Sequence, residues 1–291
     1  MSARTQRARF LLRRLVTRPA AALSLLYLAV IGVAALSVNW LGLDPLEQDL
    51  GHMLEGPSAA YPFGADELGR DILARVIYGA RTSLTTAFGA VALAASIGVP
   101  MGLIAGFFGG WRETLLMRLV DLMLALPGIL LALALIAILG RSQTAALVAV
   151  GLTGVPTFAR IVRAQVLSLK RRDFVTAVEA FGGSPAYSML HAILPNAWSP
   201  ILTQMVVLSS VAILLEAALA FLGVGIPPPT PSWGEMLRSG KEYLYEAPTY
   251  AVLPGLALTL TILSFDTLGR TLATLLEGRE PGLPQPRNAA P

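Results

Sequence analysis

Cysteine is absent from this sequence, histidine occurs only twice and charged residues are few. Asp, Glu, Lys and Arg make up 14% of the 291 residues, against about 25% in an ordinary soluble domain. Without cysteine there are no disulfides, thiolate metal sites or cysteine nucleophiles, and His52 and His191 alone argue against a histidine-rich metal site. The scarcity of charge excludes a disordered chain and is unlike the surface of a soluble enzyme, so it favours a membrane protein.

Nucleotide-binding and hydrolase motifs are also missing. A phosphate-binding loop requires Gly, four residues and then Gly-Lys-Ser/Thr, but the one Gly-Lys pair, at 240–241, is followed by Glu242. Glu235 stands where the first Gly of that loop is needed, and neither His-Glu-x-x-His nor Gly-x-Ser-x-Gly occurs. We therefore expect that the chain is not an enzyme. Energy for uphill transport would come from a partner or from an ion gradient.

Long apolar runs predict an all-α, polytopic membrane protein with six transmembrane helices. Apolar residues make up 55% of the chain, and its mean hydropathy is +0.65. A helix needs about 20 apolar residues to cross a bilayer. The first run follows a basic lead that is too long for a typical signal peptide, so we do not expect its cleavage. The predicted helices are 21–40, 84–106, 116–139, 143–163, 199–222 and 250–272.

The positions of the basic residues predict the orientation. With the N-terminus inside, about three quarters of the 22 Lys and Arg residues fall in inside segments, as the positive-inside rule requires. Both termini are therefore expected in the cytoplasm. The chain divides into a basic segment at 1–20, a first helix and outside loop at 21–77, a transmembrane domain at 78–276 with an inside loop at 164–198, and a tail at 277–291.

Two acidic residues near the inner ends of predicted helices have basic neighbours. Asp121 follows Arg118 by three residues, so we expect an ion pair on one helical face. Asp266 is expected to lie within reach of Arg160 or Arg163. Both acids are interpreted as structural, although ionisable residues inside helices are also typical of ion-coupled carriers.

Glu216 is the most deeply placed acid in the predicted helices. We expect it to face protein or water, because a carboxylate is costly in lipid. A proton relay through Glu216 is disfavoured because no second deep acid accompanies it. An ion-coupled secondary carrier stays an alternative, as does a membrane scaffold or receptor without transport activity.

The inside loop contains a short amphipathic helix. Phe174, Ala177, Val178 and Phe181 share one helical face, at the spacing i, i+3, i+4, i+7. Such a face has no core of its own in the loop, so it suits a groove on another protein. The alternative is a helix pair that lies on the membrane surface.

A glycine corner follows this helix. Gly182-Gly183 is expected to end it, and Ser184 can cap a second helix that has Pro185 at its first position. The second helix is expected to end before Pro195. The sequence therefore predicts two short helices that meet at an angle in the cytoplasm.

This segment resembles the EAA loop of ABC importer permeases. The family pattern is Glu-Ala-Ala, three residues, Gly, nine residues, an apolar position, one residue and Leu-Pro. In this sequence Thr176 replaces the usual Glu, which puts in doubt the ion pair that the family's loop makes with its ATPase. The matching positions are Thr176, Ala177, Val178, Gly182, Ala192, Leu194 and Pro195.

Other stretches resemble the second permease type of dipeptide, oligopeptide and nickel importers. The segment 62–71 is similar to the family's outside loop, and four more segments match in the same order along the chain. They are 106–111, 118–121, 216–225 and 231–234. The outside residues singled out by the resemblance are Asp66, Arg70, Asp71 and Trp233.

The resemblance implies a type I ABC importer permease in the bacterial inner membrane. Such a permease forms a heterodimer with a homologous permease, while one or two ABC ATPase subunits hold ATP and Mg²⁺ and an extracytoplasmic binding protein delivers substrate. The substrate is expected to be a short peptide, with a nickel chelate as the alternative. The basic segment 1–20 would be an elbow helix on membrane lipid, and no bound cofactor, metal or nucleic acid is expected. The residues implied to dock on the ATPase are Phe174, Thr176, Ala177, Val178, Gly182, Pro185, Leu194 and Pro195.

Overall fold

Helices form all the regular secondary structure in the part of the chain that the structure describes. This computed structural model describes residues 14, 17–38, 40 and 42–276, so the expected elbow helix at 1–20 lies largely outside the described residues and the tail at 277–291 entirely so. The long helices are α2 (Pro19–Ser37), α3 (Ile72–Phe108), α4 (Gly110–Leu124), α5 (Gly128–Leu139), α6 (Gln143–Leu169), α9 (Leu194–Phe221) and α11 (Thr249–Leu276). The short helices are α7 (Asp173–Ala180), α8 (Pro185–Tyr187) and α10 (Trp233–Gly240).

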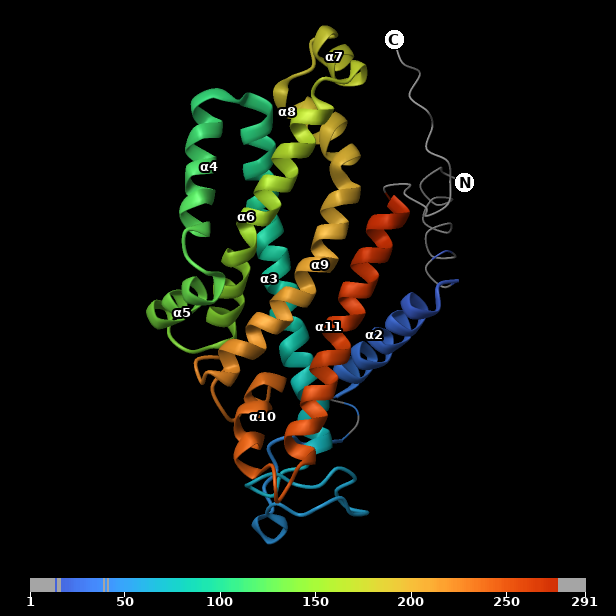
Figure 1. Cartoon of the computed structure of the whole chain (residues 1–291), viewed down its shortest axis with the longest axis vertical. Coiled ribbons are helices and arrows are strands. Elements are labelled where there is room, and N and C mark those ends of the chain that lie inside the picture. The colour runs from blue at the N-terminus through green and yellow to red at the C-terminus, as the bar shows by residue number, and fades with distance from the viewer. Residues whose placement is uncertain (1–13, 15–16, 39, 41, 277–291) are drawn as a thin grey trace.

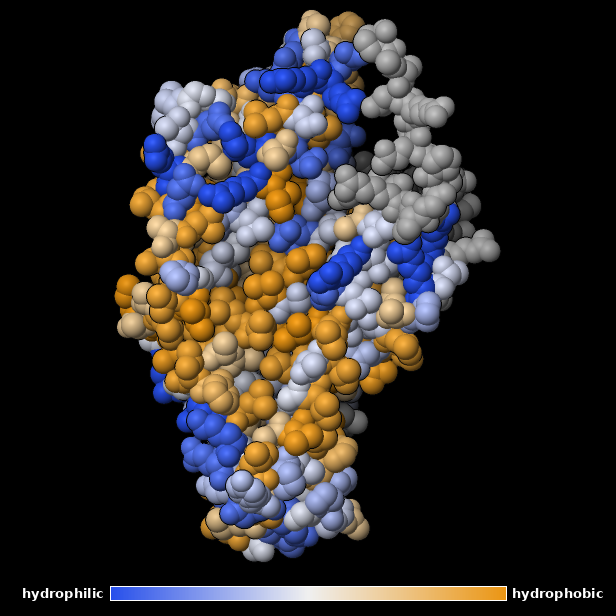
Figure 2. All heavy atoms as spheres, in the orientation of Figure 1, coloured by the Kyte–Doolittle hydropathy of each residue, from blue (hydrophilic) through white to orange (hydrophobic). Residues whose placement is uncertain are grey.

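The long helices form an elongated bundle with a different structure at each end. Helices α7 and α8 lie at one end, and α10 with the loop that follows α2 lies at the other (Figure 1). We call these the α7 end and the α10 end. Apolar side chains cover the middle of the visible face, and hydrophilic side chains gather toward both ends (Figure 2). This distribution suits a bilayer across the middle of the bundle.

The number of membrane-spanning helices agrees with the six that the sequence predicts. Five helices are long and apolar enough to cross a membrane, and a sixth span is formed if α4 and α5 are counted as one bent pair. The predicted helix at 116–139 is two helices, because α4 and α5 meet at an angle of 90°. Pro127 causes the break, since it has no N–H to donate and its ring disfavours a helical residue before it.

Two predicted helix starts are also wrong. α3 begins at Ile72 rather than near residue 84, and the Asp71 carboxylate caps it by accepting a hydrogen bond from the Leu73 N–H at 2.9 Å. The first turns of α3 contain charged residues, so a search for uncharged apolar runs places its start too late. α9 begins at Leu194 rather than near residue 199, because a π-helical turn precedes it and carries the helix past Pro195. Burial raises the pKa of the Asp71 carboxyl, although backbone hydrogen bonds from Leu73 and Ala74 oppose the rise.

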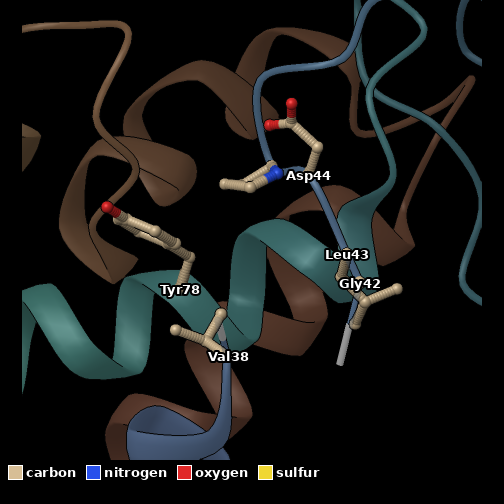
Figure 3. A pocket seen from close by; sticks show the side chains of 6 residues that line it. Val38, Gly42, Leu43, Asp44 and Tyr78 are labelled. Atoms are coloured by element: carbon tan, nitrogen blue, oxygen red, sulfur yellow. The ribbon is translucent and has the colours of Figure 1, made fainter. Parts of the chain in front are cut away.

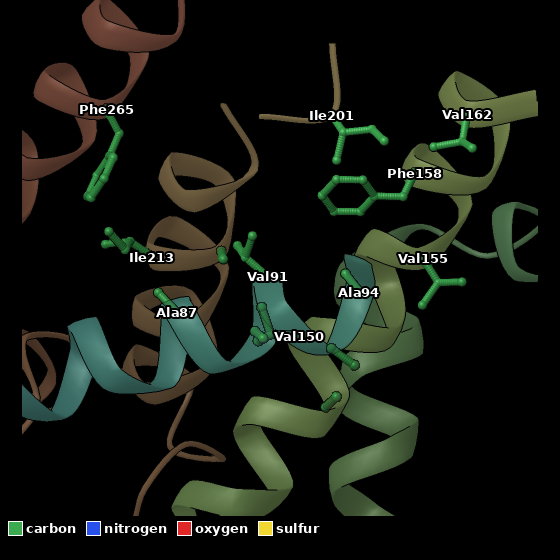
Figure 4. Packing of buried hydrophobic residues seen from close by; sticks show 14 of the residues in the cluster. Ala87, Val91, Ala94, Val150, Val155, Phe158, Val162, Ile201, Ile213 and Phe265 are labelled. Carbon is green, nitrogen blue, oxygen red and sulfur yellow. The ribbon is translucent and has the colours of Figure 1, made fainter. Parts of the chain in front are cut away.

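Glycine allows α3 and α6 to pack closely. A side-chain carbon at Gly102 of α3 would lie 2.6 Å from the Ala159 carbonyl oxygen of α6, so only glycine fits this contact. Close approach through small residues is typical of helices in membranes. Around this contact Ala94, Val162 and Phe158 fill the space between α3 and α6 (Figure 4).

Buried ion pairs hold the α10 end together. Arg75 of α3, 1% exposed, lies 3.2 Å from Asp66 of the first loop and 3.2 Å from Glu235 of α10. Arg70 adds a hydrogen bond of 2.6 Å to the same Asp66 carboxylate. Since Asp66 is fully buried, the network joins three separate segments and is shielded from water.

Trp233 of α10 packs against α3 at the α10 end. It is fully buried, and its indole N–H donates to the Val76 carbonyl oxygen at 3.0 Å. A surface pocket of about 230 Å³ lies nearby, between the end of α2 and α3, with Asp44 and Tyr78 on its walls (Figure 3). The Asp44 carboxylate already accepts a hydrogen bond from the Leu46 N–H at 2.8 Å.

Replacing Arg75 by Met is expected to destabilise the protein strongly. Removal of Arg75 leaves the buried Glu235 carboxylate without its counter-charge and the Asp66 carboxylate with Arg70 alone, and breaking a buried pair in this way typically costs about 3–5 kcal/mol. Arg270→Met is the matched control, because its ion pair with Asp266 is exposed at the surface and such pairs contribute about 0–1 kcal/mol. Thermal unfolding of the two variants in detergent measures the difference, and equal shifts in Tm would contradict the role given to Arg75.

Candidate functional site

The predicted docking helix presents apolar side chains to solvent. α7 is anchored through Val175, which is fully buried, whereas Phe174 is 41% exposed and Phe181 is 92% exposed. Tyr187 and Leu190, on the other side of the corner, are also more than half exposed. We call residues 173–195 the coupling element. Its exposed apolar surface has nothing to cover it within the described residues, but Val178, which the sequence places on the same face, packs partly buried against the core of the bundle.

The glycine corner is confirmed. Gly182 has φ of 78°, in the left-handed region that favours glycine. Its own Cβ direction opens to solvent, while the Gly183 N–H donates to the Val178 carbonyl oxygen at 2.9 Å and closes the end of α7. The predicted cap is also present, because the Ser184 hydroxyl accepts from the Tyr187 N–H at 3.2 Å, with Pro185 in the first turn.

The second helix of the coupling element does not end before Pro195, which corrects the sequence prediction. It continues through a π-helical turn at Ser188–Ile193 directly into α9. The helix passes Pro195 at the point where the π-helical turn changes to α-helix, a local adjustment of the kind that accommodates proline inside a helix. Ile193, which is fully buried, fixes this junction to the bundle. The corner is therefore joined to a spanning helix without a flexible loop.

Thr176 stands at the position where the family pattern has Glu. It is exposed on α7, and its hydroxyl donates to the Arg172 carbonyl oxygen at 3.4 Å in the preceding turn. The hydroxyl is thus occupied within the helix. The exposed charges closest in sequence are instead Asp173 and Glu179, each three residues away, followed by Arg172 at the start of α7.

Lys170 fastens the base of the coupling element. Its Nζ donates to the Phe107 carbonyl oxygen at 2.6 Å and lies 4.9 Å from the centre of the Phe107 ring. This contact joins the end of α6 to the end of α3. The coupling element therefore rests on the closely packed pair of helices at the centre of the bundle.

The predicted partners of Asp121 and Asp266 are wrong. Asp121 pairs with Arg160 of α6 at 2.8 Å rather than with Arg118, because α6 packs across α4 and brings Arg160 closer than the next turn of its own helix. Asp266 pairs with Arg270 at 2.8 Å, one turn along α11, rather than with an arginine of α6. Side chains four residues apart are neighbours on a helix.

Glu216 faces protein, as the sequence predicts. It is 1% exposed and lies beside the hydroxyls of Ser83 and Ser232, although no described residue meets its carboxylate oxygens in good hydrogen-bond geometry. The Ser83 hydroxyl also accepts a hydrogen bond from the Trp233 N–H at 3.4 Å. Glu216 thus lies where α3, α9 and the start of α10 meet.

The four outside residues named by the resemblance have structural positions. Asp66 and Arg70 belong to the buried ion network, Asp71 caps α3, and Trp233 is enclosed. Sequence reasoning missed Arg75 and Glu235, whose charges meet only in the fold. It also missed the pair between Glu113 and Arg163, which joins α4 to α6 with a hydrogen bond of 2.6 Å.

Comparison with known proteins identifies the family of this chain. Residues 98–280 match the family described as the inner membrane component of binding-protein-dependent transport systems. The chain belongs to this family. It is a multi-pass inner membrane protein and a component of a transport system.

Relatives with known names include two peptide permeases. The dipeptide transport system permease protein DppC of Alkalihalophilus pseudofirmus is 43% identical over 79% of this chain and 76% of that protein. The di/tripeptide transport system permease protein DppC of Pseudomonas aeruginosa is 39% identical over 91% of this chain and 88% of that protein.

A solved structure confirms the predicted type I ABC importer permease fold. The MetNI methionine ABC transporter, in an inward-facing conformation, contains a chain that matches with a TM-score of 0.53. The match covers 69% of this chain and 97% of that chain, at 19% identity. At this identity the likeness concerns the fold alone.

Replacing Gly182 by Val is expected to uncouple ATP hydrolysis from transport while the protein still inserts. A β-branched residue resists the left-handed conformation, at a cost of about 1–2 kcal/mol, so the corner would change its angle. Gly182→Asn is the matched control, because Asn adopts this conformation far more readily. The measurement is the ratio of transported substrate to ATP hydrolysed by the assembled transporter. A normal ratio for Gly182→Val would show that the corner angle does not matter.

Proposed function

We propose that this chain is a permease subunit of an ATP-driven, binding-protein-dependent importer of short peptides. The observation that carries the proposal is the 43% and 39% identity to dipeptide and di/tripeptide permeases over most of the chain. The exposed apolar surface of the coupling element supports it, since a helix of this kind suits a groove on a partner protein. ATP hydrolysis belongs to that partner, because this sequence has no phosphate-binding loop.

The translocation pathway is shared with a second permease. Where α3, α6 and α9 meet, the space lined by Ala90, Thr153 and Leu208 is only about 10 Å³, which is barely the volume of one water molecule. A peptide cannot pass through the middle of such a bundle. This packing supports a pathway along the interface with a homologous permease, which would complete the heterodimer.

The coupling element is the lever between ATPase and bundle. ATP binding draws two ATPase subunits together, and their docked coupling elements move with them. Because the corner continues into α9, this movement is passed to the whole bundle and switches the pathway from inward-open to outward-open. The free energy comes from the higher affinity of ATP for one of the two states. The binding protein would deliver the peptide at the α10 end, which is extracytoplasmic in this arrangement.

Uptake measurements on the complete transporter test the proposal. Cells or vesicles that contain both permeases, the ATPases and the binding protein are expected to accumulate a labelled dipeptide when ATP is present, and vanadate is expected to stop them. Glu216→Gln should leave the rate and its pH profile unchanged, because the buried carboxylate is a packing group. Uptake that follows a proton gradient, with Glu216→Gln inactive, would favour the ion-coupled carrier instead. Uptake of a nickel chelate and not of a peptide would show that the substrate is the chelate.

Single thiols test the orientation and the docking. Because the chain has no cysteine, Tyr245→Cys at the α10 end and Phe181→Cys at the α7 end each introduce one thiol on an exposed side chain. In intact cells a membrane-impermeant maleimide is expected to label only Tyr245→Cys. In permeabilised cells Phe181→Cys should become reactive when the ATPases are missing and protected when they are present. Labelling of Phe181→Cys in intact cells would reverse the orientation, and a lack of protection would refute docking at this surface.

A further inference from the structure

An open cleft of charged residues lies between α4 and α6. Its space is about 500 Å³, and its polar walls are formed by Glu113, Arg118 and Asp121 of α4 together with Arg160 and Arg163 of α6. Hydrophilic side chains gather over this part of α4 toward the α7 end (Figure 2). The cleft has room for a small molecule with charged groups, unlike the packed centre of the bundle.

The cleft lies next to the break in the bent span. Asp121 is about 16 Å along α4 from Gly110, at 1.5 Å per residue, and the break at Pro127 follows within two turns. Ionised groups in spanning helices avoid lipid and face other protein or a water-filled cavity. The Arg160 and Asp121 side chains are nevertheless 55% and 54% exposed in this chain. The cleft therefore faces water or another protein rather than lipid.

The charges in the cleft are not balanced. Asp121 is paired with Arg160, and Glu113 with Arg163, so these four groups hold α4 on α6. Arg118 is exposed and has no ion-pair partner within the described residues. The other four charged groups of the cleft are paired with one another. The Arg118 guanidinium is therefore available to bind an anionic group. The geometry of guanidinium suits a carboxylate, which it can bind through two parallel hydrogen bonds.

We propose that this cleft is a binding station on the inner part of the pathway, where Arg118 binds the terminal carboxylate of the transported peptide. The inference rests on the proposed function and adds to it a residue that recognises the substrate. The carboxylate of Asp121, one turn from Arg118, accepts from the ammonium group of the same zwitterion. A peptide that has passed the break at Pro127 thus meets groups of both signs, so its two charged ends are not released into an apolar passage.

Protection of a thiol in the cleft tests this inference. Thr114 lines the cleft and is uncharged, so Thr114→Cys adds a single thiol to this cysteine-free chain. The assembled, nucleotide-free transporter is treated with a thiol reagent while a dipeptide or its C-terminal amide is added without binding protein. We expect the dipeptide to slow the modification and the amide to do so much more weakly. Adding Arg118→Gln should raise the protective dipeptide concentration by about tenfold, since one charge-assisted interaction is lost.

Arg112→Gln is the matched control on the same helix. Arg112 lies 4.5 Å from the centre of the Phe108 ring and is not part of the cleft, so this change should leave protection by the dipeptide intact. The inference is overturned if the dipeptide gives no protection, or if Arg118→Gln and Arg112→Gln behave alike. ATP-dependent dipeptide uptake by Thr114→Cys is measured in parallel. Uptake without protection refutes the cleft alone, whereas absence of uptake in the unaltered transporter refutes the proposed function.

Discussion

The close contact between α3 and α6 is the constraint on which the rest of the molecule depends. Because Gly102 and Gly106 have no side chains, the backbone of α3 contacts α6 directly in the half of each helix that is nearer the α7 end. The hydrophobic effect does not hold helices together inside lipid, so contacts at this distance supply the attraction. They fill the centre of the bundle, carry the coupling element at one end and leave the charged groups of α6 to face outward beside α4.

A solid bundle has a consequence for transport. A helix pair that touches at van der Waals distance moves as a rigid body, because a packed interior transmits displacement with little compression. In the proposed mechanism, force applied at the glycine corner would reach the α10 end through α9, because the corner joins α9 without a loop. The two ends are suited to different tasks: the α7 end exposes apolar side chains such as Phe181, whereas the α10 end has its charges buried around Arg75.

Helix periodicity and local turn chemistry could be read from the sequence where neighbouring residues decide the structure. The apolar face of α7, the left-handed Gly182 and the Ser184 cap each depend on residues within one or two turns, and all three are present. Two helix starts were misplaced, because the starts of α3 and α9 lie outside the uncharged apolar runs. Arg75 lies in the first turns of α3, before the apolar run, and its partners Asp66 and Glu235 come from other segments.

The sequence by itself determined the class of protein, the number of spans and the location of the coupling element, because hydropathy and a local motif are properties of short stretches. Only the tertiary structure decided which charges meet. Asp121 has Arg118 three residues away but pairs with Arg160, which is 39 residues distant along the chain. Such pairs depend on how helices cross, and helix crossing depends on the packing of the whole bundle. For the same reason, the cleft around Arg118 could be seen only in the folded chain.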